Sequence, residues 1–173
     1  VGVSGPALKT FSNELCCLFD QDIREEPDYD YMIHPMPPQF KDRARACGYG
    51  LFDLKNIQRD DRDKRRAHNR ENFSFFGAPL ALFFFLPPKA ERGNFLDLGL
   101  FLQTIMLGLV AHGLGSCPQA SLMAYSQTIK QRFNIDSKWT FVCALSIGVP
   151  DPDNLVNTYV PERLPVHDYL DWI

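Results

Sequence analysis

The segment from His112 to Ser121, HGLGSCPQAS, has more special residues than the end of a helix requires. It follows the apolar run FLDLGLFLQTIMLGLVA, and one glycine after the last helical residue is enough to end a helix. Gly113 and Gly115 can adopt a positive φ and let the backbone approach a ligand closely. Pro118 stiffens the turn, and the amides that follow it can donate hydrogen bonds. The segment therefore has two interpretations, an ordinary helix end followed by a loop, or a backbone surface that holds a ligand.

Other chemistries find little support in the sequence. The chain has no GxSxG, P-loop or HExxH motif. Its five cysteines form no CxxC pair and are odd in number, which is typical of reduced thiols in a cytoplasmic protein. The four histidines are isolated, so we expect no metal site. A formal net charge of −3 argues against a nucleic-acid partner or a membrane surface.

The elements that must position the segment follow from hydrophobic periodicity. With 173 residues, 45% of them hydrophobic, the chain is long enough for one domain that spans residues 1–173. Short apolar runs bounded by proline predict strands that are covered on both faces. We expect helices at 7–23, 39–58, 94–115 and 122–133, strands at 78–86 and 139–149, and a proline-rich loop at 25–38. The charged stretch 59–71 continues the second helix or begins another.

The helix at 94–115 is apolar on all sides, so it needs cover on all sides. Asn94 and Asp97 resemble a capping box and predict where it begins. It is long enough to span a bilayer, but Asp97, Gln103, Thr104 and His112 interrupt it. A second subunit is the simplest cover, and the core of a monomer is an equal alternative.

Four motifs, in order, carry a resemblance to a known family: NFSFFGAPLALFF, DLGLFLQTIMLGLVAHGLGSCPQAS, IGVPDPDN and ERLP. From about Gly5 to the C-terminus the sequence resembles the FMN-dependent nitroreductase family. The resemblance implies an α+β fold, in which helices flank a central and mainly antiparallel sheet. It also implies a homodimer, with the long helix buried at the interface, and a cytoplasmic location.

The resemblance implies an oxidoreductase with FMN as its cofactor. FMN would take a hydride from NAD(P)H and pass reducing equivalents to a nitroaromatic, quinone or related acceptor in a ping-pong mechanism. Because the flavin carries this chemistry, we assign no catalytic side chain. The alternative is a flavin-binding dimer that no longer turns over.

Residues of this chain that match the family's motifs receive predicted roles. Arg163 matches a basic residue on the FMN phosphate, which a planar guanidinium fork suits. Asn72 matches a residue at the pyrimidine edge of the flavin, where a carboxamide can both donate and accept. The residues predicted to lie against the isoalloxazine are Pro118, Gln119, Ala120 and Ser121. Those predicted to line a substrate pocket above the ring are Phe73, Phe75, Phe76 and Tyr49.

The chain departs from the family at its start. Family members begin with an arginine-rich segment that binds the phosphate, and VGVSGPALKTFSNEL resembles the part that follows it. The resemblance therefore implies a single nitroreductase-like domain without its N-terminal phosphate-binding segment.

Overall fold

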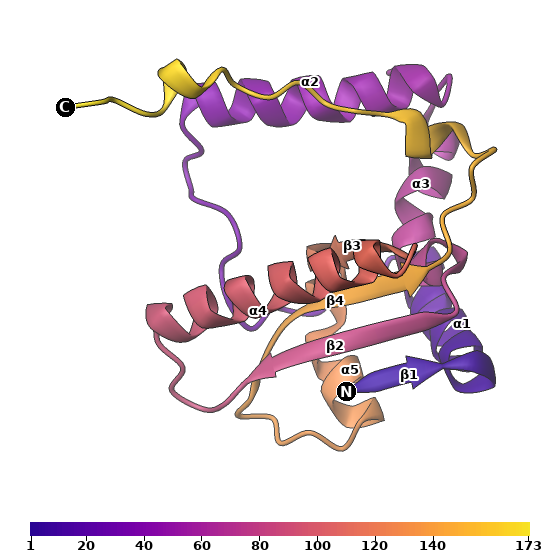
Figure 1. Cartoon of the computed structure of the whole chain (residues 1–173). Coiled ribbons are helices and arrows are strands. Elements are labelled where there is room, and N and C mark those ends of the chain that lie inside the picture. The colour runs from indigo at the N-terminus through magenta and orange to yellow at the C-terminus, as the bar shows by residue number, and fades with distance from the viewer. The chain divides into compact units, whose positions relative to one another are not determined.

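The computed structural model describes residues 1–173, and the chain separates into two compact units (Figure 1). The first unit consists of Val1–Tyr31 and Arg65–Pro150. The second consists of Met32–Lys64 and Asp151–Ile173.

The first unit is built on a four-stranded antiparallel sheet with the strand order β1-β2-β4-β3. The strands are β1 (Gly2–Ser4), β2 (Leu80–Leu86), β3 (Gly115–Gln119) and β4 (Thr140–Gly148). The central pair, β2 and β4, was predicted from the apolar runs, and its residues from Phe141 to Ile147 are buried. Both strand predictions and the α+β fold class are confirmed.

Helices lie on both faces of this sheet. On one face α1 (Gly5–Asp20), the 3-10 helix η2 (Ala120–Tyr125) and α5 (Ser126–Arg132) surround a core that contains Phe83. On the other face α4 (Arg92–Ala111) packs through Phe95, Leu98 and Leu102, and Figure 1 shows it lying along β2 and β4. Neighbouring residues of a strand point to opposite faces, so Phe83 belongs to the first core and Phe84 packs against the second.

The ends of α4 differ from the prediction. The helix begins at Arg92, because the capping box is formed by Glu91 and Asn94, with the Glu91 amide 2.9 Å from Asn94 Oδ1. It ends at Ala111. No residue of α4 is buried within the single chain. By length and composition alone, the helix could also cross a membrane.

The second unit contains α2 (Pro38–Leu54) and the short 3-10 helices η3 (Leu155–Thr158) and η4 (Val166–Asp168). The Tyr159 hydroxyl donates to the carbonyl oxygen of Cys47 on α2 at 2.9 Å. A side chain at Gly50 would collide with the Tyr159 ring, so glycine permits this close approach. A separate helix, α3 (Arg62–Arg70), follows α2, which resolves the prediction for 59–71.

A buried ion pair joins the loop after α1 to α5 and β4. Lys130 Nζ lies 2.8 Å from Asp28 Oδ1, and the two side chains are only 3% and 10% exposed. Lys130 also donates to the carbonyl oxygens of Ser137 and Trp139. Asp28 in turn accepts the amide of Phe141 at 2.8 Å. Each charge therefore has several partners, which offset the cost of removing it from water.

Two buried acids predict that alkaline pH destabilises the fold. Burial raises the pKa of the Cys143 thiol from 9.0 to about 11, and burial raises the pKa of Tyr29 from 10.0 to about 12. Above pH 9 the unfolded chain loses protons that the folded chain keeps, so stability falls as pH rises. We therefore expect the melting temperature to decline as the pH rises from 9 to 12. Cys143→Ala should reduce the part of this decline that begins at pH 9, to which Cys16 and Cys117 also contribute because burial raises the pKa of their thiols. An unchanged pH profile in this variant would contradict the assignment.

Candidate functional site

The segment around Asn72 has an unusual backbone. It forms the 3-10 helix η1 (Glu71–Gly77), in which Phe75 and Phe76 have φ angles of 53° and 54° and Gly77 has 77°. Left-handed conformations are costly for residues other than glycine, so the surrounding structure must hold them. Phe75 supplies that anchor, because its ring is fully buried and lies 5.8 Å from the ring of Phe83.

This geometry corrects two predicted roles. Phe73 and Phe75 were predicted to line a substrate pocket, but both pack in the core beneath η1, and the ring of Phe73 lies 5.2 Å from that of Tyr125. Phe76 is the exposed phenylalanine of this run, with 45% of the residue accessible to solvent. Phe73 and Phe75 are used for core packing, and the sequence alone does not show which phenylalanines of the run are buried.

The segment 112–121 is a helix end followed by a strand. The amides of Gly113 and Leu114 bond to the carbonyl oxygens of Val110 and Leu109, which is a Schellman motif, and Gly113 has a φ of 71°. Gly115 has no positive φ, and its role is different, because an added Cβ would lie 2.9 Å from Pro150.

The loop that was predicted around Pro118 is instead the edge strand β3, where proline is tolerated. Pro118 and Ser121 are exposed, and Ala120 between them is half-buried. The chain therefore presents the residues after the strand at the surface, at the point where β3 becomes η2.

A connected set of polar groups joins η1, β3 and β4. The buried Gln119 side chain, 2% exposed, donates from Nε2 to the carbonyl oxygen of Asn72 at 2.7 Å. Its Oε1 accepts a short hydrogen bond from the hydroxyl of Ser146. The Ser121 hydroxyl donates to Asn72 Oδ1 at 2.9 Å. Of the predicted site residues, the structure thus brings Asn72, Gln119 and Ser121 together.

The half-buried carboxamide of Asn72 keeps capacity for a ligand. Its Oδ1 accepts one bond from Ser121, and its Nδ2 donates one bond, 3.1 Å long, to the carbonyl oxygen of Asn69. A carboxamide has two lone pairs and two N–H groups, so one acceptor and one donor position remain. The side chain of Gln119 is committed within the protein, so only its backbone can meet a ligand.

Arg163 and Tyr49 belong to the second unit, and their roles stay predictions. The exposed guanidinium of Arg163 donates to the carbonyl oxygen of Pro161 at 3.1 Å. Tyr49 lies on α2 with much of its ring exposed.

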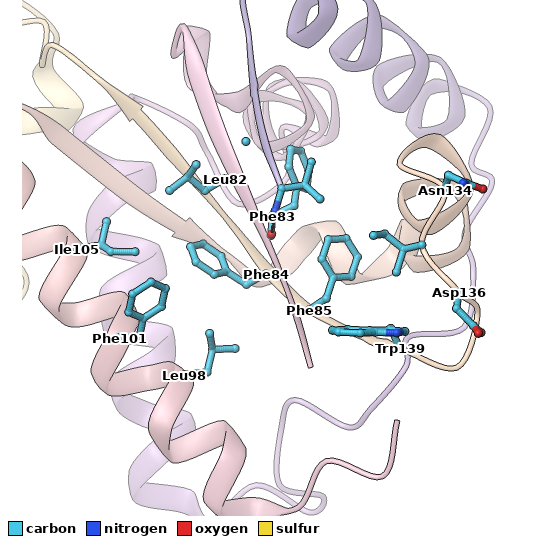
Figure 2. Close-up of a pocket in the computed structure, with 13 residues that line it drawn as sticks. Leu82, Phe83, Phe84, Phe85, Leu98, Phe101, Ile105, Asn134, Asp136 and Trp139 are labelled. Carbon is cyan, nitrogen blue, oxygen red and sulfur yellow. Dashed lines mark hydrogen bonds between the residues drawn. The ribbon is translucent and has the colours of Figure 1, made fainter. Parts of the chain in front are cut away.

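A groove of about 710 Å³ in the first unit is lined by none of the predicted site residues. Figure 2 shows Leu98, Phe101 and Ile105 of α4 facing Phe84, with Trp139 beside Phe85. Its walls are mostly apolar, and the groove continues onto the apolar surface of α4.

Ser146 is the member of this polar set that the sequence interpretation did not include. Its signal is a single hydroxyl within the apolar strand run WTFVCALSIGV. A polar residue at such a position indicates a buried hydrogen bond, but the sequence does not identify its partner.

The family model described as the nitroreductase family matches residues 48–149. The chain is 32% identical to a 4-nitrobenzoate reductase of Pseudomonas putida, over 77% of this chain and 60% of that protein. It is 30% identical to nitroreductase NfnB of Mycolicibacterium smegmatis, over 90% of this chain and 65% of that protein. The chain thus spans less than two thirds of the length of these relatives.

Solved structures of nitroreductases are also similar to this chain. One is the crystal structure of an FMN- and NADPH-dependent nitroreductase NfnB from Sphigopyxis sp. strain HMH. It has a TM-score of 0.93 and 28% sequence identity, and the match covers 100% of this chain and 78% of the NfnB chain. The FMN-dependent NfnB of Mycobacterium smegmatis in complex with NADPH also has a TM-score of 0.93, with 26% identity, covering 100% of this chain and 77% of its own.

Proposed function

Because the chain belongs to the nitroreductase family, we propose that it is an FMN-dependent oxidoreductase that transfers reducing equivalents from NAD(P)H to nitroaromatic acceptors. The observation that carries this proposal is the polar set around Asn72, beside the β3–η2 junction. It offers one donor and one acceptor at a half-buried position, as the pyrimidine edge of a flavin requires. The names of the similar proteins, which include FMN and NADPH, support the same cofactor and reductant.

FMN, when bound, supplies the hydride chemistry, and the protein supplies binding and orientation. In this proposal Asn72 bonds the pyrimidine edge. Pro118, Ala120, Ser121 and the backbone of Gln119 lie against the ring. Arg163 binds the phosphate, and Phe76 and Tyr49 contact the acceptor. No side chain is assigned as a general acid or base.

The acceptor class follows the relatives, which are named for 4-nitrobenzoate, chloronitrobenzene and nitrobenzene. Quinones and related acceptors are included in the proposal because they too are planar and electron-poor.

We infer a ping-pong mechanism, in which the nicotinamide leaves before the acceptor binds in the same place. Initial rates with NADPH and 4-nitrobenzoate should give parallel double-reciprocal lines. Intersecting lines would contradict the shared binding place, and flavin binding without turnover would favour the alternative, a flavin-binding dimer without activity.

We further propose that a second copy of this chain covers α4, with an interface centred on residues 95–110. Leu96, Leu100, Phe101, Leu107 and Val110 are large apolar side chains that the single chain leaves more than half exposed. Such a continuous apolar surface marks an interaction site. Asp97, Gln103 and Thr104 place polar groups along the helix, which favours a protein partner over lipid. The proposal includes a cytoplasmic location, because the five cysteines are free thiols.

The proposed phosphate contact gives a prediction. Arg163→Ala should weaken binding of FMN but not of riboflavin, because riboflavin has no phosphate. Loss of one charge-assisted contact should cost about 1.5–3 kcal/mol, or roughly ten- to a hundredfold in affinity. Flavin fluorescence titrations measure both ligands, and Arg45→Ala, at an exposed position on α2, is the matched control. Equal weakening of both ligands would show that Arg163 supports the fold instead.

A further inference from the structure

Ser146 is a buried serine on β4, a strand whose residues from Phe141 to Ile147 are all buried. It is 3% exposed, and its neighbours on β4, Leu145 and Ile147, are buried apolar residues. A hydroxyl at such a position is costly unless it is hydrogen-bonded. Its partner is Gln119 Oε1 on the neighbouring strand β3, where Gln119 pairs with Ala144, two residues before Ser146. Residues two apart on a strand share a face, so Ser146 and Gln119 lie on the same face of the sheet.

The carboxamide of Gln119 is held at both ends. Its Nε2 faces the carbonyl oxygen of Asn72 at 2.7 Å, because that oxygen can only accept, and its Oε1 accepts from the Ser146 hydroxyl. The reverse orientation would place Oε1 against the Asn72 carbonyl, so that two acceptors would face each other. Water cannot relieve that contact, because Gln119 is 2% exposed.

Asn72 needs this anchor because of where it lies. It precedes the left-handed residues Phe75 and Phe76 by only a few positions, so its backbone belongs to a segment that the surrounding packing must hold. The carboxamide of Asn72 is oriented by Ser121 and Asn69. The bond from Gln119 is the contact that fixes its backbone to the sheet.

We propose that Ser146 is a positioning residue for the flavin site: acting through Gln119, it fixes the backbone at Asn72 and so the carboxamide that meets the flavin ring. The role in flavin binding rests on the proposed function. The positioning of Asn72 stands on the geometry of the ligand-free chain.

The test compares two buried serines whose hydroxyls donate to different groups. Ser126 is fully buried, and its hydroxyl donates to the carbonyl oxygen of Met123 at 2.8 Å, outside the set of groups around Asn72. Ser146→Ala should weaken FMN and riboflavin by the same factor, about threefold to tenfold, because Asn72 meets the ring and not the phosphate. Ser126→Ala should change neither affinity, although both variants lower the melting temperature. Ser146→Thr, which keeps the hydroxyl, should restore binding.

A second readout uses the ligand-free chain. The side-chain amide NMR signals of Gln119 and Asn72, assigned through their loss in Gln119→Glu and Asn72→Asp, should both shift in Ser146→Ala and stay in place in Ser126→Ala. If the unmodified chain binds neither FMN nor riboflavin, the proposed function fails, while these signals still decide whether Ser146 positions Asn72. Unchanged Asn72 signals in Ser146→Ala, or equal loss of flavin affinity in both alanine variants, would overturn the inference.

Discussion

Replacing Lys130 by methionine is expected to lower the free energy of unfolding by about 3–5 kcal/mol. The change removes the ammonium that lies 2.8 Å from Asp28 and leaves that carboxylate, 10% exposed, without its counter-charge. It also leaves the carbonyl oxygens of Ser137 and Trp139 without this donor. Urea denaturation followed by circular dichroism measures the loss.

The matched control is Lys138→Met, because Lys138 is exposed and close in sequence. It should cost less than about 0.5 kcal/mol. Adding Asp28→Asn to Lys130→Met should recover part of the loss, since asparagine still accepts the Phe141 amide but carries no charge. A loss below about 1 kcal/mol for Lys130→Met alone would show that water reaches this pair.

Replacing Leu100 by glutamate is expected to dissociate the proposed homodimer. Leu100 is 62% exposed in the single chain, so the change should leave the fold of the monomer intact while it places a charge in the interface. Each dimer would bury two such charges without partners, so the dissociation constant should rise about a hundredfold or more. Sedimentation velocity across micromolar concentrations measures the change.

Leu155→Glu is the control, because Leu155 has the same 62% exposure but lies on η3. It should leave the dimer unchanged. A stable monomer of the unmodified chain at micromolar concentration would contradict the interface. Binding of α4 to lipid vesicles, abolished by Leu100→Glu, would show that a membrane covers the helix instead.

The sequence was sufficient for those elements whose apolar pattern matches their burial. The run APLALFFFL has the length and the proline stop of a buried strand, and β2 occupies most of it. The end of the long helix was predicted at residue 115 and lies at Ala111, because the Schellman motif with its positive φ at Gly113 ends the helix earlier. The strand β3 was not predictable, because GSCPQ has no strand-like pattern and is ordered by pairing with β4.

Only part of the candidate site follows from local sequence. The motifs predicted Asn72 and Ser121 as members of one site, and the structure joins their side chains at 2.9 Å. The burial of Phe73 and Phe75 and the bond from Ser146 to Gln119 depend on which strands become neighbours. Contacts between residues far apart in the chain arise from tertiary packing, which a local pattern does not contain.

In the proposed function, this chain holds FMN so that NADPH can reduce it. The most direct test is to mix the FMN-loaded chain with NADPH without oxygen and to follow the visible absorption of the flavin. We predict that the absorption is lost and that it returns when 4-nitrobenzoate is added. Flavin that is bound but stays oxidised in excess NADPH and NADH would contradict the proposed activity.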